Sequence, residues 1–154
     1  MTDAGFWTKL RRCDWQDRAA LAEALALLVV ASALLRLLPF RLVGRLASAT
    51  AAAAPDDARQ APRVALVRWA VDRAAKRSPL RAMCIERGLA AAWMLRRRGL
   101  DATLFYGVAP RREGAHGIEA HVWVQHRGAD VTGTPEPGRY AVLATFPAGR
   151  DPAT

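Results

Sequence analysis

Two side chains of this sequence have the type and the setting needed for nucleophilic chemistry, Cys84 and His121. Cys84 stands at the front of a segment, Arg81 to Gly99, whose apolar residues recur at helical spacing. A helix N-terminus favours the thiolate form of a cysteine, and the thiolate is the nucleophile. His121 lies downstream in a segment that alternates like a strand, where an imidazole can take the thiol proton and return it to a leaving group.

Each of these two residues also has a plain structural interpretation. A lone cysteine in an apolar helix is more often a small buried side chain. By strand alternation His121 shares a face with Trp123, where its ring could simply pack in a core. The combination favours chemistry, because it predicts a thiol on a helix and a histidine on a strand of the sheet behind that helix.

The other cysteine and histidines are poorer candidates. Cys13 has no His or Cys partner nearby in the sequence, and we interpret it as incidental. His116 is expected in a turn and His126 at a hairpin tip, and their spacing with His121 matches no zinc pattern. The sequence has no glycine-rich phosphate loop. We therefore expect no metal site and no bound cofactor.

The most apolar segment, Ala19 to Phe40, is predicted to form a buried helix that ends at Pro39. Its uncharged interior, Ala24 to Leu35, is well short of the about 20 residues that a membrane-spanning helix needs. A helix that lies against a membrane or a partner is the second interpretation. A polar helical segment over residues 8–18 is expected before it, and a short amphipathic continuation over residues 40–49 after it.

The helix that carries Cys84 has two possible starts. A preceding helix is predicted over Pro62 to Arg77. Ser78 could then cap the next helix, with Pro79 at its first position, which would put the thiol in the second turn. A nucleophilic thiol requires a start near Met83 instead, with a loop or single turn before it, and we favour that later start.

After Gly99 the pattern changes to that of strands. Arg127-Gly128 is typical of a tight turn, and the last strand is expected to be short or at a sheet edge. The predicted strands cover Ala102 to Val108, Ile118 to Gln125, Ala129 to Thr132 and Tyr140 to Phe146. The predicted fold class is therefore α+β, with a helical N-terminal part and a short antiparallel sheet.

The chain is expected to divide into three parts. Residues 1–60 form the predicted N-terminal helical region, which ends in a surface linker beginning at Ser48. Residues 61–146 form the predicted core, and residues 147–154 a loose tail. The N-terminus shows no signal peptide, so we expect a reducing cytoplasm, which keeps a catalytic thiol available.

The charge of the chain is strongly positive. It has 23 basic and 14 acidic residues among 154, a net charge of +9, and 52% hydrophobic residues, enough for one folded domain. Such a charge attracts an acidic peptide, a nucleic acid or an anionic membrane face without selecting among them. No aromatic residues are interleaved with the Arg96 to Arg98 run, which we interpret as a solvated helix end, so we expect no nucleic-acid partner.

Two segments of the chain resemble a known family. The sequence Cys84-Ile-Glu-Arg87-Gly-Leu89, followed downstream by Glu119-Ala-His121-Val-Trp123-Val, is similar to the leader peptidases of lasso-peptide biosynthesis. The resemblance extends from about residue 8 to residue 135. The first helix, ending in Leu-Leu-Pro39-Phe, looks like the start of the stand-alone version, which lacks a fused leader-recognition domain. It implies a transglutaminase-like, papain-related cysteine protease fold.

The resemblance also implies an activity and partners. It makes Cys84 the nucleophile and His121 the general base that together cut a ribosomally made precursor peptide between leader and core. The expected partners are this precursor, a separate leader-recognition protein and the lasso cyclase. An acyl- or amine-transferase of the same fold is the runner-up, and a non-catalytic helical scaffold at a membrane or partner surface is the third interpretation.

The chain departs from the family at the third member of the triad. The family has an aspartate twelve residues after the histidine, and this chain has Gly133 there. Asp130 is a possible substitute, but a turn at Arg127-Gly128 would place it opposite Gln125, about 13 Å along the strand from His121 and too far to orient the imidazole.

The same register places Thr134 opposite His121. Three substitutes for the aspartate then remain, namely Glu136, a backbone carbonyl or a water molecule. A Cys–His pair with a weaker orienting group can still be active, so we retain the peptidase as the leading hypothesis.

Overall fold

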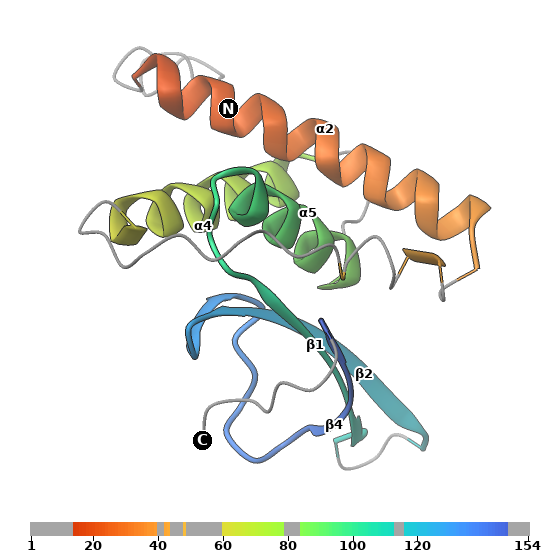
Figure 1. The fold of residues 1–154 in the computed structure, drawn as a ribbon. Coiled ribbons are helices and arrows are strands. Elements are labelled where there is room, and N and C mark those ends of the chain that lie inside the picture. The colour runs from red at the N-terminus through yellow and green to blue at the C-terminus, as the bar shows by residue number, and fades with distance from the viewer. Residues whose placement is uncertain are drawn as a thin grey trace, which may run out of the picture.

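The computed structural model describes residues 14–39, 42–43, 48, 60–78, 84–112 and 116–147. Helices come first in the chain and strands follow. The elements are α2 (Trp15–Leu37), α4 (Gln60–Arg77), α5 (Cys84–Arg97), β1 (Thr103–Pro110), β2 (Ile118–His126), β3 (Ala129–Thr132) and β4 (Ala141–Phe146). Figure 1 shows the helices gathered on one side of the sheet. The predicted α+β class is confirmed.

Several sequence predictions fall on residues outside the described part. They concern Cys13, most of the 8–18 and 40–49 segments, nearly all of the linker, and the tail after Pro147. The described residues also revise two helix boundaries. A single helix begins at Trp15 and takes in the polar residues before Ala19, and α4 begins at Gln60, with Pro62 inside its first turn, where a proline is tolerated.

The sheet is antiparallel with the strand order β3-β2-β1-β4. The predicted turn between β2 and β3 is present, with positive φ at both Arg127 and Gly128, as a two-residue hairpin turn of this kind requires. β4 lies at an edge, paired only with β1, in agreement with the predicted edge segment.

The register between β2 and β3 changes part-way along the pair. Gln125 pairs with Asp130 as predicted, but Val124 pairs with Thr132, so Val131 is an extra residue in β3. The constant register that placed Thr134 opposite His121 is therefore wrong beyond Gln125, because the β-bulge shifts the later residues of β3 by one position.

One apolar core joins the three helices to the sheet. α2 contributes a stripe of small and apolar side chains at helical spacing, including Ala24 and Leu28, and it packs against both α4 and α5. The core is thus continuous across the predicted boundary near residue 60. On α5, Gly88 lies so close to the sheet that a Cβ atom there would be 2.7 Å from Val122 Cγ1.

The outer side of α2 remains apolar. Val29 and Val30 are about half exposed and Leu37 is 79% exposed, while the opposite stripe is buried. By length and composition alone α2 is able to cross a membrane, a test that core helices and signal sequences also satisfy. The docked, non-spanning state of this helix stays a prediction.

Candidate active site

Polar contacts hold the first half of α5 against the other two helices. Ser32 of α2 donates a hydrogen bond to Glu86 over 3.0 Å, and Arg87 forms a 2.5 Å ion pair with Asp72 of α4. Glu86 and Arg87 lie within one turn of Cys84. The helix that carries the candidate nucleophile is therefore fixed on two sides as well as by its apolar face.

Cys84 is the first described residue of α5, and its side chain is half-buried and not in a disulfide. It packs against the rim of the apolar core. Residues 79–83 lie outside the described part, so the favoured helix start near Met83 stays a prediction. A half-buried thiol at this position remains open to a substrate from one side.

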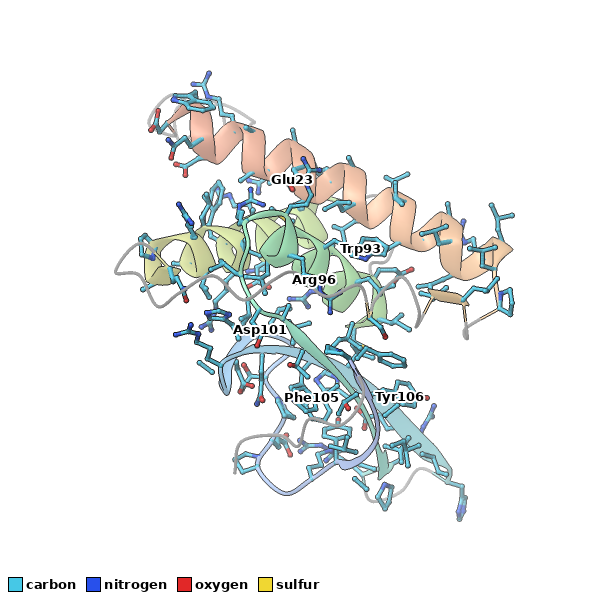
Figure 2. The ribbon with its side chains drawn as sticks, viewed as in Figure 1. Glu23, Trp93, Arg96, Asp101, Phe105 and Tyr106 are labelled. Atoms are coloured by element: carbon cyan, nitrogen blue, oxygen red, sulfur yellow. The ribbon has the colours of Figure 1, made fainter. Side chains whose placement is uncertain are left out.

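The far end of α5 fixes its direction over the sheet. Arg96 lies between α5 and the sheet, where it donates hydrogen bonds to the carbonyl oxygens of Ala102 (3.0 Å) and Phe146 (3.5 Å) (Figure 2). Ala102 directly precedes β1 at the end of the sheet where Gln125 of β2 lies. Burial lowers the pKa of the Arg96 guanidinium, with the Asp101 carboxylate opposing that shift.

This direction brings Cys84 to the same end of β2 as His121. Arg96 lies at the Gln125 end of the strand, and Gly88 lies against Val122. A helix continues in a straight line, so one further turn carries Cys84 toward the half of β2 that holds His121. The two residues lie on the elements that the sequence predicted, Cys84 on a helix and His121 on a strand of the sheet behind it, and their catalytic roles stay a prediction.

The His121 imidazole is held in place by three groups. Its Nε2 lies 2.6 Å from the carbonyl oxygen of Gly133. Its ring stacks on Tyr140, with centroids 5.0 Å apart, and more loosely on Trp123 at 6.1 Å. A carbonyl oxygen can only accept, so Nε2 carries the hydrogen and donates it, which leaves Nδ1 of the neutral ring as the proton acceptor.

The two candidate residues are not hydrogen-bonded to each other in the described part of the chain. Val122 points toward α5, whereas His121 lies with Trp123 and Tyr140 on the other face of β2. β3 pairs with β2 only as far as Val124, so beyond that point the imidazole lies at a sheet edge. Catalytic hydrogen bonds are often long in the free enzyme and tighten only when substrate is bound.

The backbone gives a reason for the glycine at residue 133, where the sequence resemblance implied an aspartate. The φ of +71° at Gly133 disfavours any residue with a side chain, and an added Cβ would lie 2.5 Å from the Val122 carbonyl oxygen and 3.2 Å from the Trp123 Cα. The backbone therefore approaches β2 too closely for a carboxylate to extend from this residue. The carbonyl of Gly133 itself occupies the orienting position against His121.

The other two substitutes considered have different partners. Asp130 accepts a hydrogen bond from Gln125 Nε2 over 3.0 Å, as the hairpin register predicted. Glu136 is paired with Arg112 and lies 3.6 Å from Arg139. Of the side chains and backbone groups considered, the backbone carbonyl is the one whose contact with His121 the structure records.

Sequence reasoning missed a polar cluster beside His121. The Tyr140 hydroxyl donates to Glu119 over 3.0 Å, and Arg139 forms a 2.7 Å ion pair with the same carboxylate. These bonds, Tyr140 first and Arg139 second, lower the pKa of Glu119, and its charge also interacts with His121. Glu119 could have been found, because strand alternation puts it on the face of His121; the position of Tyr140 has no signal in the local sequence.

The described residues contain no group of three or more His, Cys, Asp or Glu side chains placed to hold a metal ion.

Most of the chain matches the model of a known protein superfamily. The model of the transglutaminase-like superfamily matches residues 8–145, a span that includes Cys84, His121 and almost the whole sheet. The chain belongs to the transglutaminase-like superfamily. This superfamily includes cysteine peptidases and transferases. No curated protein and no solved structure matches the chain.

Proposed function

We propose that the chain is a cysteine peptidase that removes the leader from a ribosomally made lasso-peptide precursor, with Cys84 as nucleophile and His121 as general base. The observation that carries the proposal is the His121–Gly133 contact of 2.6 Å, which fixes the ring and leaves Nδ1 free to accept a proton. The placement of Cys84 on a helix that packs over the same strand supports it.

The first half of the reaction forms a thioester. His121 Nδ1 takes the proton of the Cys84 thiol, and the sulfur attacks the carbonyl carbon of the scissile peptide bond. The tetrahedral intermediate collapses when the C–N bond breaks. His121 gives its proton to the departing amine, which leaves as the first product.

The second half regenerates the thiol. A water molecule gives one proton to His121 Nδ1 and attacks the thioester carbonyl, the C–S bond breaks, and the proton returns to the Cys84 sulfur. A transferase would run the same first half and replace water by an amine. The identity of the acceptor therefore distinguishes the two activities that this superfamily includes.

The choice of substrate rests on the two motifs that resemble the lasso leader peptidases, Cys84 to Leu89 and Glu119 to Val124. By this proposal a separate small protein binds the leader and delivers the precursor, and the cyclase closes the released core peptide. The net charge of +9 suits a leader or a recognition protein of acidic character.

The test is cleavage of a full precursor by the purified chain, with products identified by mass spectrometry. We expect one cut between leader and core, incorporation of water at the new carboxyl end, and no product with Cys84→Ser, because a hydroxyl is far less acidic than a thiol. The variant Cys13→Ser is the control and should retain full activity. Transfer of the acyl group to an added amine in preference to water, or full cleavage by Cys84→Ser, would overturn the proposal.

The contribution of the recognition protein is measured in the same assay. Adding it should raise the cleavage rate strongly, and part of that gain should fade as salt screens the charges. Cleavage at full speed by this chain alone would remove the recognition protein from the proposal.

A further inference from the structure

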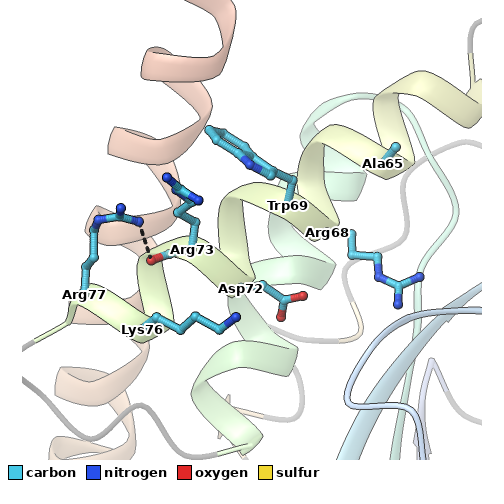
Figure 3. A pocket seen from close by; sticks show the side chains of 7 residues that line it. All are labelled: Ala65, Arg68, Trp69, Asp72, Arg73, Lys76 and Arg77. Atoms are coloured by element: carbon cyan, nitrogen blue, oxygen red, sulfur yellow. Dashed lines mark hydrogen bonds between the residues drawn. The ribbon is translucent and has the colours of Figure 1, made fainter. Parts of the chain in front are cut away.

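A basic groove runs along one face of α4. Its volume is about 600 Å³. Its lining residues repeat at intervals of three and four positions along α4, so they form a single stripe on the helix. Figure 3 shows this stripe along the length of α4. The lining residues are Ala65, Arg68, Trp69, Asp72, Arg73, Lys76 and Arg77, which we call the α4 groove.

The cations of the α4 groove greatly outnumber its anions. The single carboxylate, Asp72, is engaged by Arg87 of α5 at 2.5 Å. Arg68, Arg73 and Lys76 form no salt bridge with any residue in the described part of the chain. These cations lie on the same stripe of one helix, where like charges repel unless an anion binds between them. The groove thus presents positive charge that nothing described neutralises.

The α4 groove also offers an apolar contact. The half-buried ring of Trp69 lies beside Arg73, whose guanidinium carbon is 6.0 Å from the ring centroid. This cation–π contact leaves the guanidinium N–H groups of Arg73 available for a carboxylate. A carboxylate-bearing chain with an apolar side chain would therefore match both kinds of lining.

The position of the α4 groove relates it to the candidate nucleophile. Asp72 lines the groove and binds Arg87, which lies one turn of α5, about 5 Å along the axis, after Cys84. A peptide bound along α4 therefore needs only a few extended residues to bring another of its segments to the thiol.

We propose that the α4 groove binds an acidic segment of the peptide substrate and so positions the scissile bond at Cys84. This inference rests on the proposed peptidase function, although the binding itself needs no catalysis. It assigns recognition to side chains of this chain, in addition to any separate recognition protein.

The test measures binding apart from cleavage. A fluorescently labelled short peptide with several Glu residues around a Leu is titrated by anisotropy into the Cys84→Ser chain, which cannot turn it over. The groove variant carries Arg68→Ala and Arg73→Ala. The matched control carries Arg97→Ala and Arg111→Ala, which remove the same charge from outside the groove.

We expect the groove variant to bind the acidic peptide at least about tenfold more weakly than the Cys84→Ser parent, and the control variant to bind it within about twofold of that parent. A peptide with each Glu replaced by Gln should bind the parent weakly, and its affinity should not depend on salt. Equal affinities for the groove variant and the control would overturn the inference. Preferential binding of a single-stranded oligonucleotide by the same residues would also overturn it.

A second readout separates this inference from the proposed function. With Cys84 intact, a short substrate that lacks the acidic segment should be cleaved at the same rate by the wild-type chain and by the chain that carries Arg68→Ala and Arg73→Ala. Loss of binding with intact cleavage of that short substrate supports the α4 groove as a recognition site. Intact binding with no cleavage by any form of the chain contradicts the peptidase proposal alone.

Discussion

The Nε2 atom of His121 and the carbonyl oxygen of Gly133 lie 2.6 Å apart, so a backbone group contacts the imidazole where the sequence resemblance implied an aspartate side chain. A carbonyl fixes the tautomer and the plane of the ring, but it is neutral and adds no negative charge beside a developing imidazolium. The carboxylate that interacts electrostatically with His121 is Glu119, two residues before it on the same face of β2.

Placing at residue 133 the aspartate that the sequence resemblance implied should harm this protein. Gly133→Asp forces a side chain onto a residue with φ +71°, with its Cβ 2.5 Å from the Val122 carbonyl oxygen. We expect the free energy of unfolding to fall by about 1–3 kcal/mol and the cleavage rate to fall as well, because β3 must move away from His121. Chemical denaturation and the precursor assay measure the two effects.

Gly138 provides the control for Gly133, because its φ is +69° and an added Cβ would meet nothing within 4 Å. Gly133→Ala and Gly138→Ala share the cost of the backbone conformation, about 1 kcal/mol, and differ in the contact with β2. Gly133→Ala should be clearly the more destabilising of the two. Equal destabilisation, or a gain of activity in Gly133→Asp, would mean that the close approach does not shape the site.

The Tyr140–Glu119 hydrogen bond should affect the pH at which the Glu119 carboxyl titrates. The pKa of Glu119 is lowered in the folded chain, chiefly by this bond and then by Arg139. The stabilisation is therefore complete above the ordinary glutamate pKa of about 4.3 and is lost as the pH falls through the lower folded value. In Tyr140→Phe, which keeps the ring stacked on His121, the Glu119 carboxyl should titrate at higher pH by NMR.

Tyr106→Phe is the matched variant, since Tyr106 of β1 pairs with Val122 and packs against the core on the α5 side of the sheet. It should leave the Glu119 titration unchanged. If Tyr140→Phe also leaves it unchanged, the hydroxyl does not contribute to the charge state of Glu119.

Arg96 is half-buried between α5 and the sheet and should be important for stability, whereas the neighbouring Arg97 should not. Arg96→Ala leaves the carbonyls of Ala102 and Phe146 without the guanidinium that joins α5 to the sheet, at a cost of about 1–3 kcal/mol in the free energy of unfolding. Arg97, whose side chain is 69% exposed and 3.5 Å from Glu23, is the control, and its alanine variant should lose less than about 1 kcal/mol. Similar losses in the two denaturation curves would contradict this difference.

Local patterns sufficed to predict most of the elements. β3 begins at Ala129, directly after the predicted turn, and it ends before Thr134 as predicted, because its turn and its alternation are set by neighbouring residues. The pairing of Asp130 with Gln125 followed from the same turn. The shared face of His121 and Trp123 followed from the two-residue period of a strand.

The parts of the site that depend on tertiary contacts were not predictable. The extra residue Val131 in β3 has no sequence signal. It shifts the register of the residues that follow it, and Gly133, which contacts His121, is among them. A backbone carbonyl as orienting group cannot be read from side-chain types, so it remained one of several alternatives. The stack of Tyr140 on His121 joins residues from β2 and from the segment that enters β4, whose approach local patterns do not fix.

The central claim, that His121 activates Cys84, is tested most directly by the rate at which a thiol-directed peptide electrophile labels Cys84. Labelling is followed by intact mass and peptide mapping at neutral pH, in a Cys13→Ser background, for the parent, His121→Ala and His116→Ala, with folding checked by circular dichroism. We predict one adduct, at Cys84, formed at least about tenfold more slowly in His121→Ala and at the parent rate in His116→Ala, whose side chain is exposed. Equal labelling rates in the parent and in a folded His121→Ala variant would contradict the account.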